Sequence, residues 1–132
     1  MKPQLTCLDH LVLTVASIPD TCAFYQTVLG MEAEEFAPTI GSPRWALLFG
    51  SQKINLHQVG AEFEPKAARA TAGSGDLCFL SDVPLADWQD HFARYSIDVL
   101  DGPVARTGAT GPIISLYLRD PDGNLIEISN PA

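Results

Sequence analysis

The chain has 132 residues, enough for one domain or for two small half-domains that share a core. Its 16 acidic and 8 basic residues give a net charge of −8, which disfavours nucleic acid and anionic membranes as partners. No run approaches the roughly 18 apolar residues of a membrane span, and the N-terminus lacks an apolar signal core. We therefore expect a soluble, cytoplasmic protein.

The first half of the chain is predicted to form a strand, a helix and three more strands. Alternating and β-branched residues over 8–15 indicate the first strand. Ser17 and Pro19 then start a helix that ends near Leu29, because Gly30 is a natural C-cap. Three short strands are expected at 31–36, 44–50 and 53–59, with a hairpin turn between the last two.

A polar connector over 60–75, rich in Gly, Pro and Ala, leads to a second half with the same pattern. Its elements are expected as a strand at 75–81, a helix at 83–96, a strand or strand and turn at 97–104, a long Gly-rich loop at 101–112, and strands at 112–120 and 123–130. His10 and Asp76 then occupy equal places in the two opening strands, and Asn55 and Glu127 equal places in the two closing strands.

The sequence thus predicts an α+β fold built from two βαβββ modules, at 5–60 and 74–132, within a single domain of residues 1–132. Strand alternation gives each sheet an apolar face toward its helix and a second face opposite. The second faces collect polar and ionisable residues: His10, Asn55, His57, Asp76, Ser115, Tyr117 and Glu127. Each would need a partner in a core, whereas a metal or substrate pocket is built from such groups. We expect two curved sheets around a shared cavity.

At these residues the chain resembles the vicinal oxygen chelate superfamily of glyoxalases, bleomycin resistance proteins and dioxygenases. The segments that carry the resemblance are LDHLVLTVASIPDTCAFYQTVLGM, LLFGSQKINLH and LYLRDPDGNLIEISN. Within the superfamily, FGSQKINLH, EFEPKA and GPVARTGATGPI resemble the glyoxalase domain-containing protein 5-like branch. The resemblance implies the glyoxalase/bleomycin resistance fold and a divalent metal that chelates neighbouring oxygens of the substrate.

The family takes its metal ligands from the opening and closing strands of both modules. His10 and Glu127 match that pattern, whereas Asn55 replaces the usual glutamate and Asp76 the usual histidine. His57, two residues beyond Asn55, would complete a set of two histidines and one carboxylate, which suits Zn, Ni, Fe, Mn or Co. Asp76 is then a fourth ligand or orients a ligand histidine.

The resemblance implies a glyoxalase-type lyase or isomerase that acts through a metal-stabilised enediolate. We expect Glu127 to act as the base, Tyr117 to donate a hydrogen bond, and four residues to bind substrate: Asn55, Arg106, Thr107 and Ser115. Two alternatives stay open, a ring-cleaving iron dioxygenase and a metal-free protein that binds a small molecule or drug. The family also predicts a homodimer in which His10 of one chain and Glu127 of the other share a site.

Overall fold

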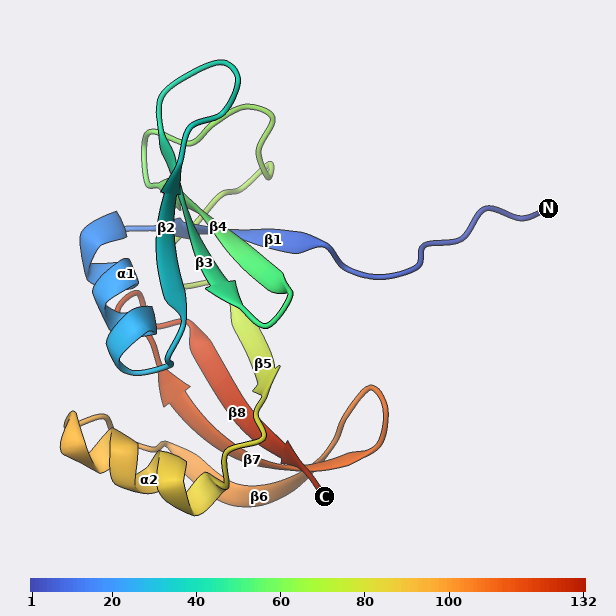
Figure 1. Ribbon diagram of the computed structural model, residues 1–132, viewed down its shortest axis with the longest axis vertical. Coiled ribbons are helices and arrows are strands. Elements are labelled where there is room, and N and C mark those ends of the chain that lie inside the picture. Colours follow the sequence, from blue (N-terminus) through green and yellow to red (C-terminus); the bar gives the residue numbers. More distant parts are fainter. The chain divides into compact units, whose positions relative to one another are not determined.

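The computed structural model describes all 132 residues, and the chain divides into two compact units, Met1–Ala70 and Thr71–Ala132. Each unit holds one helix and one mixed four-stranded sheet, which confirms the expected α+β class (Figure 1). Neither helix has the length and hydrophobicity that crossing a membrane requires.

The first unit begins with a parallel strand pair and adds an antiparallel pair. Its elements are β1 (His10–Val15), α1 (Ile18–Thr27), β2 (Glu32–Phe36), β3 (Arg44–Phe49) and β4 (Gln52–Gln58). The strand order is β1-β4-β3-β2, and only β1 and β4 run parallel. The helix α1 begins as expected, because Ser17 Oγ accepts a hydrogen bond from the Asp20 N–H at 3.2 Å and a proline stands in the first turn.

The second unit repeats this topology with its own five elements. These are β5 (Asp76–Leu80), α2 (Leu85–Arg94), β6 (Asp101–Thr107), β7 (Pro112–Arg119) and β8 (Leu125–Pro131). The order is β5-β8-β7-β6, with β5 parallel to β8 (Figure 1). Val12 is aligned with Asn55 in the first unit, and Cys78 with Glu127 in the second. The registers therefore place Asn55 and Glu127 at equivalent points.

The core of each unit lies between the helix and one face of its sheet. In the first unit Tyr25 of α1 and Leu47, Ile54 and Leu56 of the sheet are at most 1% exposed. In the second unit the equivalent apolar face is formed by Leu116, Leu118, Ile126 and Ile128, and α2 contributes Phe92. Burying these side chains leaves the opposite face of each sheet to the polar residues, since neighbouring strand residues point to opposite sides.

One expectation about the second unit was wrong. Residues 101–107 form strand β6, so the Gly-rich loop is confined to 108–111, where the Gly108 N–H donates to the Gly111 carbonyl at 2.8 Å. Glycine and proline are typical of loops, but β6 is an edge strand, where a proline breaks few ladder bonds. The pairing of β6 with β7 is irregular between Asp101 and Val104, the stretch that holds Pro103. Arg106 and Thr107 consequently sit on a strand.

The turn before β8 is fixed by the buried side chain of Asp120. This carboxylate accepts hydrogen bonds from the Asp122 N–H at 3.0 Å, the Asn124 N–H at 2.9 Å and the Asn124 side-chain amide at 2.7 Å. Asn124 Oδ1 in turn accepts from the Gly75 N–H at 2.7 Å, next to the start of β5. The turn therefore ties the beginnings of the two parallel strands of the unit together.

Candidate functional site

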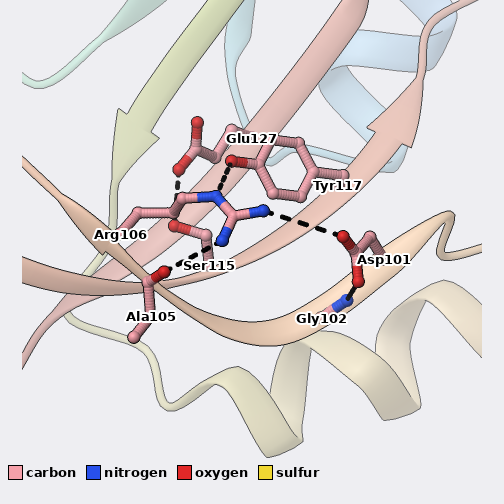
Figure 2. A network of polar contacts seen from close by, with 7 residues as sticks. All are labelled: Asp101, Gly102, Ala105, Arg106, Ser115, Tyr117 and Glu127. Carbon is pink, nitrogen blue, oxygen red and sulfur yellow. Dashed lines mark hydrogen bonds and ion pairs between the residues drawn. The ribbon is translucent and has the colours of Figure 1, made fainter.

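Glu127 lies in the middle of β8 on the polar face of the second unit, directly opposite Cys78 on β5 and Tyr117 on β7. Ser115 Oγ donates a hydrogen bond to Glu127 Oε2 at 2.5 Å (Figure 2). Ser129 Oγ lies 3.4 Å from the same oxygen. Both serines are fully buried. One oxygen of the carboxylate is thus anchored to the sheet.

The hydroxyls beneath Glu127 form a hydrogen-bonded chain. Ser115 and Ser129 are bonded at 2.7 Å, and Ser129 is bonded to the Cys78 thiol at 3.3 Å. A hydroxyl has a single proton to donate. Because Ser115 uses its proton on Glu127, it accepts in its bond with Ser129, whose hydroxyl also lies within reach of Glu127 Oε2. Burial raises the pKa of the Cys78 thiol, and the nearby Glu127 charge adds to this effect, while the hydrogen bond to Ser129 lowers the pKa.

Arg106 and Tyr117 form a second group beside the carboxylate. Arg106 Nε donates to the Tyr117 hydroxyl oxygen at 3.0 Å, its Nη1 donates to the Ala105 carbonyl at 3.0 Å, and its Nη2 lies 3.7 Å from Asp101 Oδ2 (Figure 2). A guanidinium has five N–H donors, so both terminal nitrogens keep donors for another partner. The Tyr117 oxygen is an acceptor in this bond, and its own proton is left for a further acceptor.

These groups border a pocket of about 420 Å³ that lies within the second unit. Its lining comes from β5, β7, β8 and the end of β6 with the loop that follows: Cys78, Leu80, 106–110, Ile113 and Glu127. A carboxylate and a guanidinium therefore open onto the same mostly apolar pocket. This combination of an apolar wall and a few convergent polar groups is typical of small-molecule sites.

The polar face of the first unit carries His10 and Asn55 at the positions that Asp76 and Glu127 occupy in the second. His10 Nδ1 is 2.8 Å from Asp9 Oδ2, and this bond lowers the pKa of the Asp9 carboxyl. A carboxylate on Nδ1 is the usual partner of a metal-ligating histidine, because it leaves Nε2 to bind the metal. Asn55 Oδ1 is buried without a hydrogen-bond partner.

His57 lies on the same face but away from His10. Its strand partner in β1 is Thr14, whereas His10 is aligned with Lys53, so the two histidines are four residues apart, about 13 Å along the strands. Burial lowers the pKa of His57, and the positive charge of Arg44 adds to the effect. Within the first unit these two histidines are not placed to hold one ion.

Glu127, Arg106 and Thr107 line one pocket, and Ser115 and Tyr117 are hydrogen-bonded to two of these lining residues. The four expected ligands are divided between the units, with His10 and His57 in one and Asp76 and Glu127 in the other. No group of three or more His, Cys, Asp or Glu side chains is close enough to hold a metal ion. Each unit instead offers one diagonal pair of donors, His10 with Asn55 and Asp76 with Glu127.

The sequence profile of the glyoxalase/bleomycin resistance protein/dioxygenase superfamily matches residues 7–128. The chain belongs to this superfamily. A virulence protein of Salmonella typhimurium, STM3117, is 56% identical over 122 residues, which make up 92% of this chain and 82% of that protein. The glyoxalase domain-containing protein RDO1 of Mycosarcoma maydis is 55% identical over 123 residues, 93% of this chain and 67% of that protein.

Solved structures of the superfamily agree with this assignment. The crystal structure of STM3117 has a TM-score of 0.92 at 52% identity and covers 98% of this chain and 100% of its own. Two remoter structures share the fold alone. One is a lactoylglutathione lyase from Agrobacterium tumefaciens, with 23% identity and a TM-score of 0.69, which covers 96% of this chain and 95% of its own. The other is TnmS3, an antibiotic binding protein from Streptomyces, with 16% identity and a TM-score of 0.75, which covers 99% of this chain and 100% of its own.

Sequence reasoning missed four residues of this superfamily member that the site uses. Ser129 and Cys78 were visible as polar-face residues by alternation, but their bonds depend on the register between strands. Asp9 precedes β1 and falls outside any strand pattern. Arg44 lies at the start of β3, where the register, extended by one residue, places it opposite His57. Cross-strand pairing is needed to recognise the contacts of Ser129, Cys78 and Arg44, whereas Asp9 bonds to its sequence neighbour His10.

Proposed function

We propose that the chain is a divalent-metal-dependent enzyme of glyoxalase type, a lyase or isomerase that acts on a small substrate with two neighbouring oxygens. The observation that carries the proposal is the anchored carboxylate of Glu127. Its Oε2 is held by buried hydroxyls, and the residue opens onto a pocket that also contains Arg106. A catalytic base needs this kind of fixed placement beside a space for substrate.

The donor types fit a divalent metal. His10 offers an imidazole nitrogen that Asp9 orients, Asn55 offers a buried oxygen without a partner, and Asp76 and Glu127 offer carboxylates. Such a mixed nitrogen and oxygen set suits Zn, Mn, Fe, Ni or Co. We assign His10 with Asn55 and Asp76 with Glu127 as the two halves of the ligand set. A bound divalent cation supplies Lewis acidity that makes a C–H bond next to the chelated oxygens more acidic.

The side chains of the second unit then divide the work. Glu127 takes a proton from the carbon that carries the hydroxyl group and returns it to the neighbouring carbonyl carbon, while the hydroxyl proton passes to the former carbonyl oxygen, so that one C–H and one O–H bond break and one of each forms. The Tyr117 hydroxyl, which accepts from Arg106, donates its own proton in a hydrogen bond to a substrate oxygen. The remaining N–H donors of Arg106 bind an anionic group of the substrate.

The test is metal content and proton exchange in the same preparation. Protein purified without chelator is expected to hold divalent metal by elemental analysis, and to exchange the α-proton of a hydroxycarbonyl or hemithioacetal substrate with deuterated water. Glu127→Gln keeps the size of the side chain and removes its charge, so it should lose exchange and weaken metal binding. His10→Ala should weaken metal binding as well.

Glu35→Gln is the matched control, because Glu35 is an exposed strand carboxylate on the opposite face of the first sheet. It should retain metal and exchange. If wild type holds no divalent metal under any loading condition, the proposal is wrong and a metal-free binding protein takes its place. Oxygen uptake with catechols, in place of exchange, would instead establish the ring-cleaving dioxygenase. Light scattering tests the expected homodimer.

A further inference from the structure

The polar face of the first unit contains a pocket that the proposed chemistry does not use. It has a volume of about 240 Å³. Three strand residues form its floor, Val12, Thr14 and His57, and four residues of the connector between Pro65 and Ala70 form its wall. Every lining residue belongs to the first unit, so the pocket is complete without any other part of the chain.

His57 is the one polar side chain of this pocket that is more than nine-tenths buried. It is 7% exposed and makes no hydrogen bond, while its ring makes a T-shaped contact with the Phe63 ring, with 5.4 Å between the centroids. Phe63 is itself covered by the Arg44 guanidinium, 4.0 Å from its centre. The imidazole is therefore held in place by aromatic contacts, and its hydrogen-bonding capacity is left to whatever fills the pocket.

The repeat shows that this openness is particular to the first unit. The registers place Ser129 where His57 stands and Leu80 where Thr14 stands. Ser129 is fully buried and satisfied within its own unit by Ser115 and Cys78. At equivalent positions of the repeated fold, Ser129 is hydrogen-bonded within its own unit, whereas His57 faces a pocket without a hydrogen bond.

The lining identifies the chemistry of the ligand. Val12, Pro65 and two alanines are apolar, and the Lys66 ammonium is already paired with Glu64 at 2.8 Å, so the pocket offers no uncompensated charge. The imidazole of His57 in its neutral form offers one N–H donor and one nitrogen acceptor. Thr14 adds a hydroxyl beside it. A cavity of about 150 Å³ accommodates benzene, so this one holds a single substituted ring.

We propose that this pocket binds a small, uncharged molecule with one ring and one hydroxyl group, which exchanges hydrogen bonds with His57 and Thr14. The pocket lies toward the end of β1 that is away from His10, because His57 is aligned with Thr14, four residues beyond His10. The same molecule without the hydroxyl leaves the imidazole unsatisfied. The same ring with a carboxylate introduces a charge that the pocket does not balance.

Three probes that share a ring separate these cases: benzyl alcohol, toluene and benzoate. Each is titrated into full-length, chelator-treated protein and followed by amide chemical shifts. Benzyl alcohol should shift amides of β1, β4 and 65–70, and bind about five- to tenfold more tightly than toluene, the range expected for one buried hydrogen bond. It should also bind more tightly than benzoate.

The variants His57→Leu and Thr14→Val should each remove the preference for benzyl alcohol over toluene. His91→Leu, which changes a histidine in α2 of the other unit, should leave the preference unchanged. If benzyl alcohol shifts none of these amides, if benzoate binds most tightly, or if a folded His57 or Thr14 variant keeps the preference, the proposal is wrong. The protein is free of metal throughout, so the result is independent of the function proposed above.

Discussion

A polar residue stands at the centre of each closing strand, opposite the opening strand: Asn55 in the first unit and Glu127 in the second. Their surroundings differ. The residue facing Glu127 on β7 is Tyr117, and two buried serines hold the carboxylate, whereas the residue facing Asn55 on β3 is Ala46 and its Oδ1 has no partner. The repeat sets the backbone position, and the neighbouring strand decides whether the polar group is anchored or left open for a ligand.

The contrast extends to the next pair along the same strands. Ser115 and Ser129 are aligned in the second unit and hydrogen-bonded to each other. Arg44 and His57 stand at the equivalent positions of the first unit and do not bond to each other. A preorganised network in the second unit suits bond-making chemistry, and unpaired groups in the first suit binding. The following changes test this difference, beginning with the largest expected effect.

The first change removes the side chain that fixes the start of β8. Asp120→Ala deletes an acceptor of three hydrogen bonds that is 5% exposed, so it should lower the free energy of unfolding by about 3 kcal/mol. Urea unfolding measures the loss. Asp82→Ala, at an exposed aspartate of the same unit, should change stability by less than about 0.5 kcal/mol. Equal losses of stability for the two variants would show that the hydrogen bonds of Asp120 do not stabilise the fold.

The second change disconnects Glu127 from its anchor. Ser115→Ala removes two buried hydrogen bonds, the 2.5 Å bond to Glu127 Oε2 and the 2.7 Å bond to Ser129, which should cost about 2 kcal/mol of stability. Supporting groups of this kind typically change metal affinity by about 10- to 100-fold. Calorimetric titration with Mn²⁺ should therefore show weaker binding than in wild type and in the exposed-turn control Ser51→Ala. Unchanged affinity would mean that the anchor serves folding alone.

The third change probes the open position of the first unit. Asn55→Val removes a buried acceptor that has no partner and substitutes a residue that strands favour, so chelator-treated protein should be unchanged or up to about 1 kcal/mol more stable. Metal affinity should fall at the same time. The change in stability should therefore have the opposite sign to that of Ser115→Ala, which makes this variant the strongest test of the difference between the two units. A loss of more than about 1 kcal/mol in metal-free protein would reveal a structural bond that Asn55 supplies.

The repeated topology could be predicted because alternation, caps and turn residues act locally. Gly30, Ser17 and the Asp120–Asn124 turn each fix a boundary through their own chemistry. The strand expected at 97–104 overlaps β6 only at its start, and the rest of β6 was expected to be loop, since its glycine and proline indicate a loop unless its edge position is known. Local signals predict which residues share a face and say little about edges.

The candidate site was predictable only in part. Alternation identified Glu127, Asn55 and His10 as polar-face residues, but the hydroxyl chain under Glu127 needs the register between β7 and β8, which no local pattern specifies. The same holds for His57, whose distance from His10 follows from the pairing of β1 with β4. Side chains that meet across strands are joined by tertiary structure, and a single sequence does not record it.

The smallest effect on stability is expected at Arg106, where the consequence should appear in binding instead. Its side chain is 42% exposed and its ion pair with Asp101 spans 3.7 Å, so Arg106→Ala should change the free energy of unfolding by no more than about 0.5 kcal/mol. If the guanidinium binds an anionic group, KM for an anionic substrate should rise about tenfold while kcat changes less, because the contact is made before and during the reaction. Arg106→Lys keeps the charge and loses the geometry of the bond to Tyr117, so its KM should lie between those of wild type and Arg106→Ala. If KM stays the same for anionic and neutral substrates in both variants, Arg106 serves only to hold Tyr117. The groups that act on the substrate in the second unit would then be Glu127 and the hydroxyls bonded to it.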